Sequence, residues 1–280
     1  MRSARSVLVE LLRARYGDAA PRIPPYAANG NDVLANLFAH RSVRAFGSER
    51  LPTGTLELLI AAAQSAPSSA NLHAWSVVAV ENPARKARLA RLCDDQVSIL
   101  EAPVFLVWLA DLARLRRLAE SYGTASEALN YLDSFVRALI DVSLAAQNAA
   151  TAAESLGLGT CFVGALRNHP DRVAEELCLP PEVFPVFGLV VGYPDHERPP
   201  GEVKPRLPVN AVLHREAYGI SRESEAWRGY DAIFSAFQAS QHEAPTGWTS
   251  LAAKRVQDGA ALGSRAGLSE AVSKLGFKLS

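Results

Sequence analysis

One long amphipathic segment, from about Leu129 to Leu156, constrains the fold more than any other part of the sequence. Apolar side chains recur along it at helical spacing and merge into an alanine-rich stretch from Ala145 to Ala153, which predicts a single helix. Gly157 and Gly159 follow directly, as is typical of a helix C-terminus. Because small side chains let another backbone approach closely, we expect this helix to pack tightly against a neighbour.

Short apolar runs surround this helix and predict buried strands, because they are rich in β-branched and aromatic residues. They cover residues 75–80, 104–109, 160–163 and 186–191. Helices are predicted between them at 85–93 and 170–177. A further helix is predicted to begin after Thr53, its expected N-cap, and to end before Pro67, with Glu57 favourably placed near its N-terminus. Strands interspersed with helices predict an α+β or α/β sheet protein.

The two ends of the chain differ in pattern from this central part. A short amphipathic helix opens the chain, residues 18–31 predict an extended connection, and the main body begins near Asp32. Prolines make residues 193–208 a loop, and the pattern after Tyr218 is helical and more polar, ending in a helix at 268–275. We therefore predict an extension over 1–31, a main domain over 32–218 and a C-terminal helical extension over 219–280.

Composition and cysteine content exclude several classes of protein. Lys and Arg total 29 and Asp and Glu total 29, so there is no bulk attraction to nucleic acid or an anionic membrane. The three cysteines are widely separated, which argues against a disulfide framework or a zinc ribbon and favours a reducing compartment. The longest apolar runs are shorter than the roughly 20 residues that span a bilayer. We expect a cytoplasmic protein without a metal site.

Three polar clusters stand out against the apolar background: His40-Arg41-Ser42-Val43-Arg44, Lys204-Pro205-Arg206 and Pro67-Ser68-Ser69-Ala70-Asn71-Leu72-His73. The first two combine guanidinium, ammonium, imidazole and hydroxyl groups that suit a phosphate. The third packs small hydroxyl and amide groups into a turn that could contact a flat, polar ring edge. Each also has a plain alternative: exposed surface arginines, a loop that is charged anyway, and a helix-terminating turn.

Motifs of other chemistries find no support in the sequence. It contains no G-x-S-x-G elbow, no H-E-x-x-H pair and no P-loop, so no motif supports a hydrolase or a nucleotide-triphosphatase function. Gly157-Leu158-Gly159 lacks a third glycine and follows a helix, so it is not a dinucleotide-binding fingerprint. Cys161 lies in an apolar run and is interpreted as an inert core thiol.

Taken in order, the motifs resemble the nitroreductase family of FMN enzymes, most closely its branch of NADPH-dependent flavin reductases and oxygen-insensitive NADPH nitroreductases. The resemblance covers roughly residues 33–218, and the segment up to about Asn31 extends beyond the family core. It is carried by these segments: His40-Arg41-Ser42-Val43-Arg44-Ala45-Phe46, Ala145-Ala146-Gln147-Asn148-Ala149, Ala153-Glu154-Ser155-Leu156-Gly157-Leu158-Gly159, Val163-Gly164-Ala165-Leu166-Arg167-Asn168, Phe187-Gly188-Leu189-Val190-Val191-Gly192 and Lys204-Pro205-Arg206-Leu207-Pro208.

This resemblance implies an α+β fold with a mixed sheet flanked by helices, a homodimer with the alanine-rich helix at its interface, and FMN bound at that dimer interface. It also implies the cofactor contacts. The phosphate and ribityl contacts would be His40, Arg41, Ser42, Arg44, Lys204 and Arg206. The partners of the ribityl chain and ring would be Ser68, Ser69 and Asn71, with Gln96 as a further contact. The backbone beside the isoalloxazine would be Val163, Gly164 and Ala165.

The resemblance also implies the reaction: a ping-pong hydride transfer from NADPH or NADH through flavin N5 to a nitroaromatic, quinone or flavin acceptor. The cofactor performs this chemistry, so no side chain is assigned as a general acid or base. Arg265, in a Ser264-Arg265 pair typical of the branch, is the candidate contact for NADPH or the acceptor. The basic cluster expected before Trp248 is replaced by Glu243-Ala244-Pro245. Two alternatives stay open: a non-catalytic FMN sensor or carrier, and a flavin enzyme that uses oxygen for another oxidation.

Overall fold

The chain divides into two compact units. The computed structural model describes residues 4–24, 31–198, 200–221 and 223–280. One unit, here called the helical unit, consists of Met1–Arg41 and Gly201–Leu262, and the other, the sheet unit, consists of Ser42–Pro200 and Gly263–Ser280.

A four-stranded sheet forms the centre of the sheet unit. Its order is β1 (Trp75–Val80), β2 (Val104–Asp111), β4 (Val183–Gly192) and β3 (Gly159–Val163), and each neighbouring pair is antiparallel. Parallel pairing among the described residues is confined to an isolated bridge between Ser42 and Thr160. The predicted α+β class and all four predicted strands are confirmed, although β4 begins earlier than expected, at Val183.

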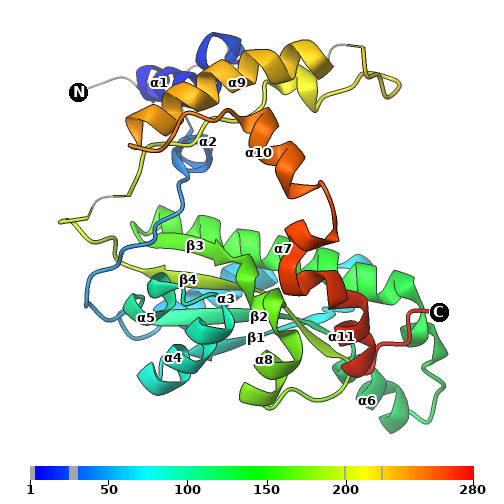
Figure 1. The fold of residues 1–280 in the computed structure, drawn as a ribbon. Helices are drawn as coiled ribbons and strands as arrows, with labels where there is room; N and C mark the ends of the chain where they lie inside the picture. Colours follow the sequence, from blue (N-terminus) through cyan, green and yellow to red (C-terminus); the bar gives the residue numbers. More distant parts are fainter. Residues whose placement is uncertain (1–3, 25–30, 199, 222) are drawn as a thin grey trace. The chain divides into compact units, whose positions relative to one another are not determined.

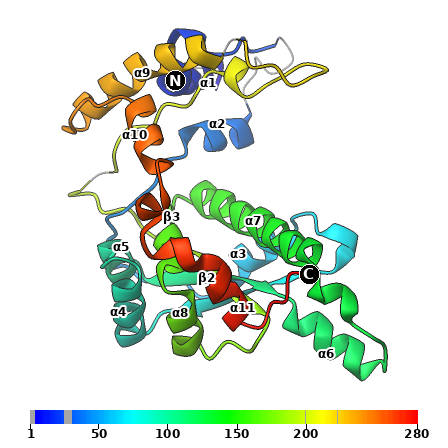
Figure 2. The same cartoon turned by 45° about the vertical axis from the view of Figure 1, so that its right-hand side comes forward.

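Helices cover both faces of this sheet. Figures 1 and 2 show α7 (Leu132–Ser155) along one face and α4 (Pro83–Leu92) and α8 (Pro170–Glu176) on the opposite face. The side chains of β2 alternate between the two cores, because successive residues of a strand point to opposite sides. Leu106 and Trp108 join the core under α7, whereas Phe105 and Val107 join the core under α4. This double burial explains why β2 is a continuous apolar run in the sequence.

The long helix α7 confirms the main sequence prediction and shows which of its faces is buried. A 3-10 turn (Glu127–Asn130) precedes it, and Gly157, with φ of 79°, follows its end. Its alanines face the sheet and α3 (Thr55–Gln64). At most 1% of the surface of each of these alanines is exposed: Ala145, Ala146, Ala149, Ala150 and Ala153. Close packing is therefore achieved within the unit, while the larger apolar side chains Leu132, Val136, Ile140 and Leu144 remain exposed.

One predicted helix cap is wrong. The N-cap of α3 is Gly54, not Thr53, and no side chain caps this helix. Gly54 has a φ of 87°, a left-handed conformation that glycine adopts without the steric cost a threonine would meet. Three further predicted helices are confirmed: α4, whose N-cap is Asn82, α8, which begins at Pro170, and α11 (Leu268–Lys274), which lies within the predicted C-terminal helix.

Helices make up most of the helical unit. They are α1 (Ala4–Tyr16), α2 (Asp32–Ala39), α9 (Glu223–Ser240) and α10 (Trp248–Arg255), with a 3-10 turn at Gly17–Ala19. Buried Leu8 and Leu12 confirm that α1 is amphipathic, and α9 buries Tyr230 and Phe234. Part of the predicted connection over 18–31, residues 25–30, lies outside the described residues. Within the described ranges, no helix has the length and apolar character needed to cross a membrane.

The segment that follows Arg41 is attached to the edge of the sheet by its backbone. Val43 N donates to Thr160 O (2.8 Å), and Gly47 N donates to Tyr193 O (3.0 Å). Phe46 N donates to Glu101 Oε2 (3.2 Å), at the end of α5 (Val97–Glu101). The second oxygen of Glu101 accepts from Arg198 Nη1 (2.9 Å). The hydrogen bond from Arg198 and, less strongly, that from Phe46 N hold the pKa of Glu101 below its ordinary value, against the effect of burial.

We predict that Glu101→Gln lowers the free energy of unfolding by about 1 kcal/mol at neutral pH, because a charge-assisted hydrogen bond is weakened. A lowered folded-state pKa contributes stability above the unfolded-state pKa, and that contribution is lost as pH falls through the folded-state value. The difference between the two proteins should therefore shrink on acidification. Urea unfolding at a series of pH values measures it, with exposed Glu49→Gln, which lies outside any helix, as the control. A difference that stays constant into acid would contradict the role given to Glu101.

Candidate functional site

The predicted contact residues are shared between the two units. His40, Arg41, Lys204 and Arg206 belong to the helical unit, and the remaining predicted residues belong to the sheet unit.

In the helical unit, a buried proline holds the backbone between two exposed cations. Pro205 is buried, whereas Lys204 and Arg206 are exposed. The carbonyl of Pro205 accepts from Tyr230 Oη (2.9 Å) and from Arg206 Nη1 (3.1 Å). Lys204 Nζ lies 5.9 Å from the ring centroid of Phe237. The backbone of this cluster is thus fixed, and both positive charges remain at the surface.

Arg15, which sequence reasoning missed, brings two of the predicted clusters together. Its guanidinium donates to the carbonyls of His40 (2.9 Å) and Lys204 (3.4 Å). Arg15 is 5% exposed and lies three residues after buried Leu12 on α1. An arginine that continues the apolar spacing of an amphipathic helix was the signal that could have identified it.

In the sheet unit, the predicted turn is held by a carboxylate from the middle of α7. Asp141 is 1% exposed, and its Oδ2 accepts from Ser68 Oγ (2.7 Å) while its Oδ1 accepts from Ser69 N (3.1 Å). Ser68 Oγ also accepts from His73 N (2.9 Å). The hydroxyl of Ser68 is therefore largely committed inside the protein, whereas Ser69 and Asn71 are exposed.

This turn is conformationally unusual. Ala70, Asn71 and His73 have φ of 51°, 56° and 49°, in the left-handed region that non-glycine residues rarely adopt. Such residues cost of order 1 kcal/mol each and persist only when their surroundings hold them. Asp141 holds one side, and Arg114 Nη1 donates to His73 O (3.0 Å) at the other. Sequence reasoning missed Asp141, because a single acidic residue in a helix resembles a surface residue.

The predicted backbone segment lies where β3 ends. Val163 is buried, and Gly164 and Ala165 begin a 3-10 turn (Gly164–Asn168) in which both are partly exposed. A Cβ placed on Gly164 would lie 3.5 Å from Arg167 Nη2. Arg167 Nη1 donates to Val186 O (2.6 Å), at the bulge where β4 shifts its register with β2. Arg167 thus lies directly beside the segment, a residue that sequence reasoning had not singled out.

The positive charges of Arg167 and Arg265 repel each other at this position. Burial lowers the pKa of Arg167, and the positive charge of Arg265 lowers it further. The Nε atom of Arg265 is buried and has no hydrogen-bond partner within the described part of the chain. An anion placed here would relieve the repulsion between the two cations.

The remaining predicted residues are also accessible. Ser42 and Gln96 are partly exposed and Arg44 is exposed. Gln96 is the N-cap residue of α5, but its side chain makes no capping hydrogen bond. Cys161, close to Ser42 and Arg44, is 6% exposed, and burial raises its pKa more than these two neighbours lower it. It fits the inert thiol expected from the sequence.

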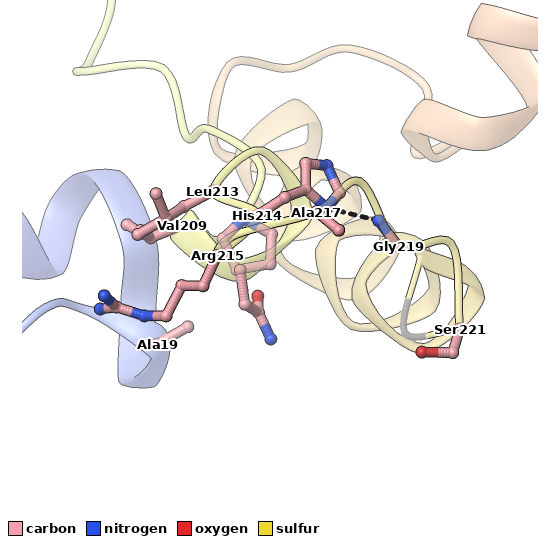
Figure 3. Close-up of a pocket in the computed structure, with 10 residues that line it drawn as sticks. Ala19, Val209, Leu213, His214, Arg215, Ala217, Gly219 and Ser221 are labelled. Carbon is pink, nitrogen blue, oxygen red and sulfur yellow. Dashed lines mark hydrogen bonds between the residues drawn. The ribbon is translucent and has the colours of Figure 1, made fainter.

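A cavity of about 750 Å³ lies within the helical unit, apart from every predicted contact residue. It is lined by Ala19 and by residues between Pro208 and Ser221. His214 Nδ1 accepts from Gly219 N (3.3 Å) in its wall (Figure 3). Neither here nor elsewhere in the described ranges do three or more metal-ligating side chains gather.

The sequence matches two family models. The nitroreductase family model matches residues 37–193, and the model of the C-terminal domain of that family matches residues 204–280. Neither match includes α1, which ends at Tyr16.

Relatives and solved structures agree with these matches. The chain is 39% identical over 194 residues to an FMN reductase (NADPH) of Bacillus subtilis, covering 69% of this chain and 77% of that protein. It is 36% identical over 182 residues to an oxygen-insensitive NADPH nitroreductase of Salmonella typhimurium, covering 65% of this chain and 72% of that protein.

A hypothetical oxidoreductase of Bacillus subtilis has a similar structure, with a TM-score of 0.84 at 33% identity, over 89% of this chain and 99% of that one. The NADPH:FMN oxidoreductase of Vibrio harveyi, solved with NAD⁺, gives 0.79 at 27% identity, over 89% and 100%. This chain belongs to the nitroreductase family.

Proposed function

We propose that the protein is an FMN-dependent NAD(P)H oxidoreductase that passes electrons to nitroaromatic, quinone or flavin acceptors. The names of its relatives support this assignment, since they include an FMN reductase (NADPH) and an oxygen-insensitive NADPH nitroreductase. When bound, FMN supplies the hydride transfer itself. The protein's part is to bind the cofactor, orient it and set the charge around it.

The observation that carries this proposal is the arrangement of the polar clusters: exposed polar side chains on backbones that buried groups hold. Arg44 is exposed on a segment whose neighbours Val43 and Phe46 are buried. Lys204 and Arg206 are exposed on either side of buried Pro205. Fixed backbones with accessible cations suit a phosphate, because little ordering is needed when the ligand binds. Together with His40, Arg41 and Ser42, they are the proposed contacts of the FMN phosphate and ribityl chain.

The other proposed FMN contacts lie in the sheet unit. Ser69 and Asn71 present exposed polar groups on the turn that Asp141 holds, and Ser68 shapes that turn through its internal hydrogen bonds. Gln96 would add an amide from the start of α5. Val163, Gly164 and Ala165 would lie beside the isoalloxazine, where a glycine lets a flat ring approach the backbone.

We predict that the purified protein is yellow with FMN and that NADPH bleaches its flavin absorbance within seconds under anaerobic conditions. Adding a nitrofuran, a quinone or free FMN should then restore the absorbance without oxygen. A protein that holds FMN but is not bleached by NADPH or NADH would be a sensor or carrier. A flavin that is reoxidised only by oxygen, with a new organic product, would indicate the other oxidative chemistry.

Arg265 is the proposed contact of NADPH. Its positive charge acts on Arg167, which lies beside Gly164, and its buried Nε has no hydrogen-bond partner within the described residues. A phosphate group of NADPH would satisfy that atom and relieve the repulsion between the two guanidiniums.

We predict that Arg265→Gln raises the KM for NADPH by about tenfold, because a charge-assisted contact is worth about 1.5–3 kcal/mol. If the contact is the 2′-phosphate, the KM for NADH should change little. Steady-state kinetics with a quinone acceptor measures both, with exposed Lys278→Gln as a control of equal charge change. Unchanged KM values for both nucleotides would exclude Arg265 from the nucleotide site.

A second copy of the chain is proposed to pack on the outer face of α7. Leu132, Val136, Ile140 and Leu144 recur every four residues on that helix and are 50%, 41%, 52% and 40% exposed. Residues at this spacing share one helix face, and a continuous exposed apolar face is typical of an association surface. This exposed face supports a homodimer interface on the outer side of α7, whereas the alanines of the same helix pack inside the unit.

We predict that Ile140→Lys converts a dimer into a monomer and weakens FMN binding, because a buried unpaired charge opposes association. Light scattering after size-exclusion chromatography measures the mass. The matched control is Leu118→Lys, which alters an apolar residue of similar exposure (53%) on α6 (Ala113–Ser121). A wild-type protein that is monomeric, or an Ile140→Lys variant that stays dimeric, would rule out this interface.

The cytoplasm is the proposed location. Cys93, Cys161 and Cys178 are all free thiols, which fits a reducing compartment.

A further inference from the structure

The N-terminal helix contains a buried arginine whose hydrogen bonds reach two segments far away in the sequence. Within the helical unit, Arg15 Nη2 donates to Phe38 O (2.8 Å) and to His40 O (2.9 Å), and its Nη1 donates to Lys204 O (3.4 Å). The carbonyl of Arg15 in turn accepts from Arg206 N (2.9 Å). Arg15 therefore contacts both of the basic clusters proposed to hold the FMN phosphate.

The first of these segments begins at the end of α2. His40 is the C-cap residue of this helix, so Phe38 O and His40 O are among the carbonyls that lack a partner within the helix. A guanidinium at a helix C-terminus satisfies such carbonyls and interacts favourably with the helix dipole. Arg15 thus fixes the point at which α2 stops and the basic segment starts.

We propose that Arg15 is a positioning residue for the FMN phosphate, and that α1 is in this way part of the cofactor site. The proposal rests on the FMN-binding function proposed above. It gives a role to a helix that lies outside both family matches, which cover residues 37–193 and 204–280.

The direction of the peptide groups supports this role. A phosphate is repelled by carbonyl oxygens and attracted by N–H groups and cations. Arg15 holds the carbonyl of His40 inside the unit, and the carbonyl of Lys204 accepts from Arg15 Nη1 (3.4 Å) as well as from Arg206 Nη1 (3.1 Å). The peptide bonds are trans, so the N–H of Arg41 points opposite to the carbonyl of His40 and away from Arg15. The exposed surface is left to the side chains of Arg41, Lys204 and Arg206.

The chemistry of arginine suits this task better than that of lysine. The planar guanidinium offers several N–H donors in a fixed fork and can span carbonyls from separate segments, whereas an ammonium is a compact point charge. Leu8 and Leu12, 2% and 5% exposed, dock the same face of α1 and hold the arginine in place. Arg13, two residues earlier, is exposed and provides a matched control.

The test compares FMN with riboflavin, which lacks the phosphate. Both flavins are titrated into the full-length apoprotein and followed by flavin fluorescence, with circular dichroism to verify folding. Arg15→Met keeps the apolar stem and removes the fork. It should weaken FMN binding by about tenfold, as expected for lost charge-assisted positioning, and leave riboflavin binding nearly unchanged. Arg15→Lys should be intermediate, and Arg13→Met should behave as the wild type.

The ratio of the two Kd values separates positioning from a general structural role. A destabilised helix would weaken both flavins alike, so an unchanged ratio in folded Arg15→Met would overturn the proposal. If Arg15→Met does not fold, Arg15→Lys decides in the same way. If the wild type binds FMN no tighter than riboflavin, the proposed phosphate site itself fails. A wild type that prefers FMN, with variants that keep the full preference, leaves the FMN function standing and removes only the role of Arg15.

Discussion

Burial of β2 on both of its faces is the constraint on which the sheet unit depends. Every residue of this strand is buried, and its side chains enter two separate cores in alternation. Helices must therefore cover both faces of the sheet, and only its edges and strand ends remain for polar segments. The proposed flavin contacts lie there: Ser42 pairs with Thr160 at the edge, and Gly164 follows the end of β3.

A common principle holds the polar segments in place. In each case a charged side chain, buried or largely so, binds the main chain of a loop, and other polar side chains of the same loop stay exposed. Asp141 binds the turn at Ser69, Glu101 binds the segment at Phe46, and Arg15 binds the carbonyls of His40 and Lys204. Buried charges are costly unless they are hydrogen-bonded, so these groups require one particular loop position. Rigid loops with accessible cations are suited to an anionic cofactor, since little entropy is lost on binding.

Local patterns in the sequence were sufficient for much of this architecture. The strands at 75–80 and 104–109 and the helix near 129–156 follow from apolar period, length and glycine position, which are properties of neighbouring residues. Clusters of chemistry-bearing residues were visible for the same reason. The sequence pattern predicted the wrong N-cap for α3, because the cap depends on a single backbone angle: Gly54, with a positive φ, takes the place of Thr53. It also missed α2, although the Asn31 N-cap and Asp32 in the first turn are local signals of a helix start.

The sequence by itself determined the α+β class, the positions of the main strands and helices, and the family, because each is written in local spacing and motif order. Only the tertiary structure decided which side of α7 is buried, since alanines and larger side chains both count as apolar positions in the sequence but differ in how closely a neighbour can approach. It likewise revealed Arg15 and Asp141. Their partners lie 189 and 73 residues away in the sequence, so local spacing could at most mark Arg15 as buried and could not name what either residue binds.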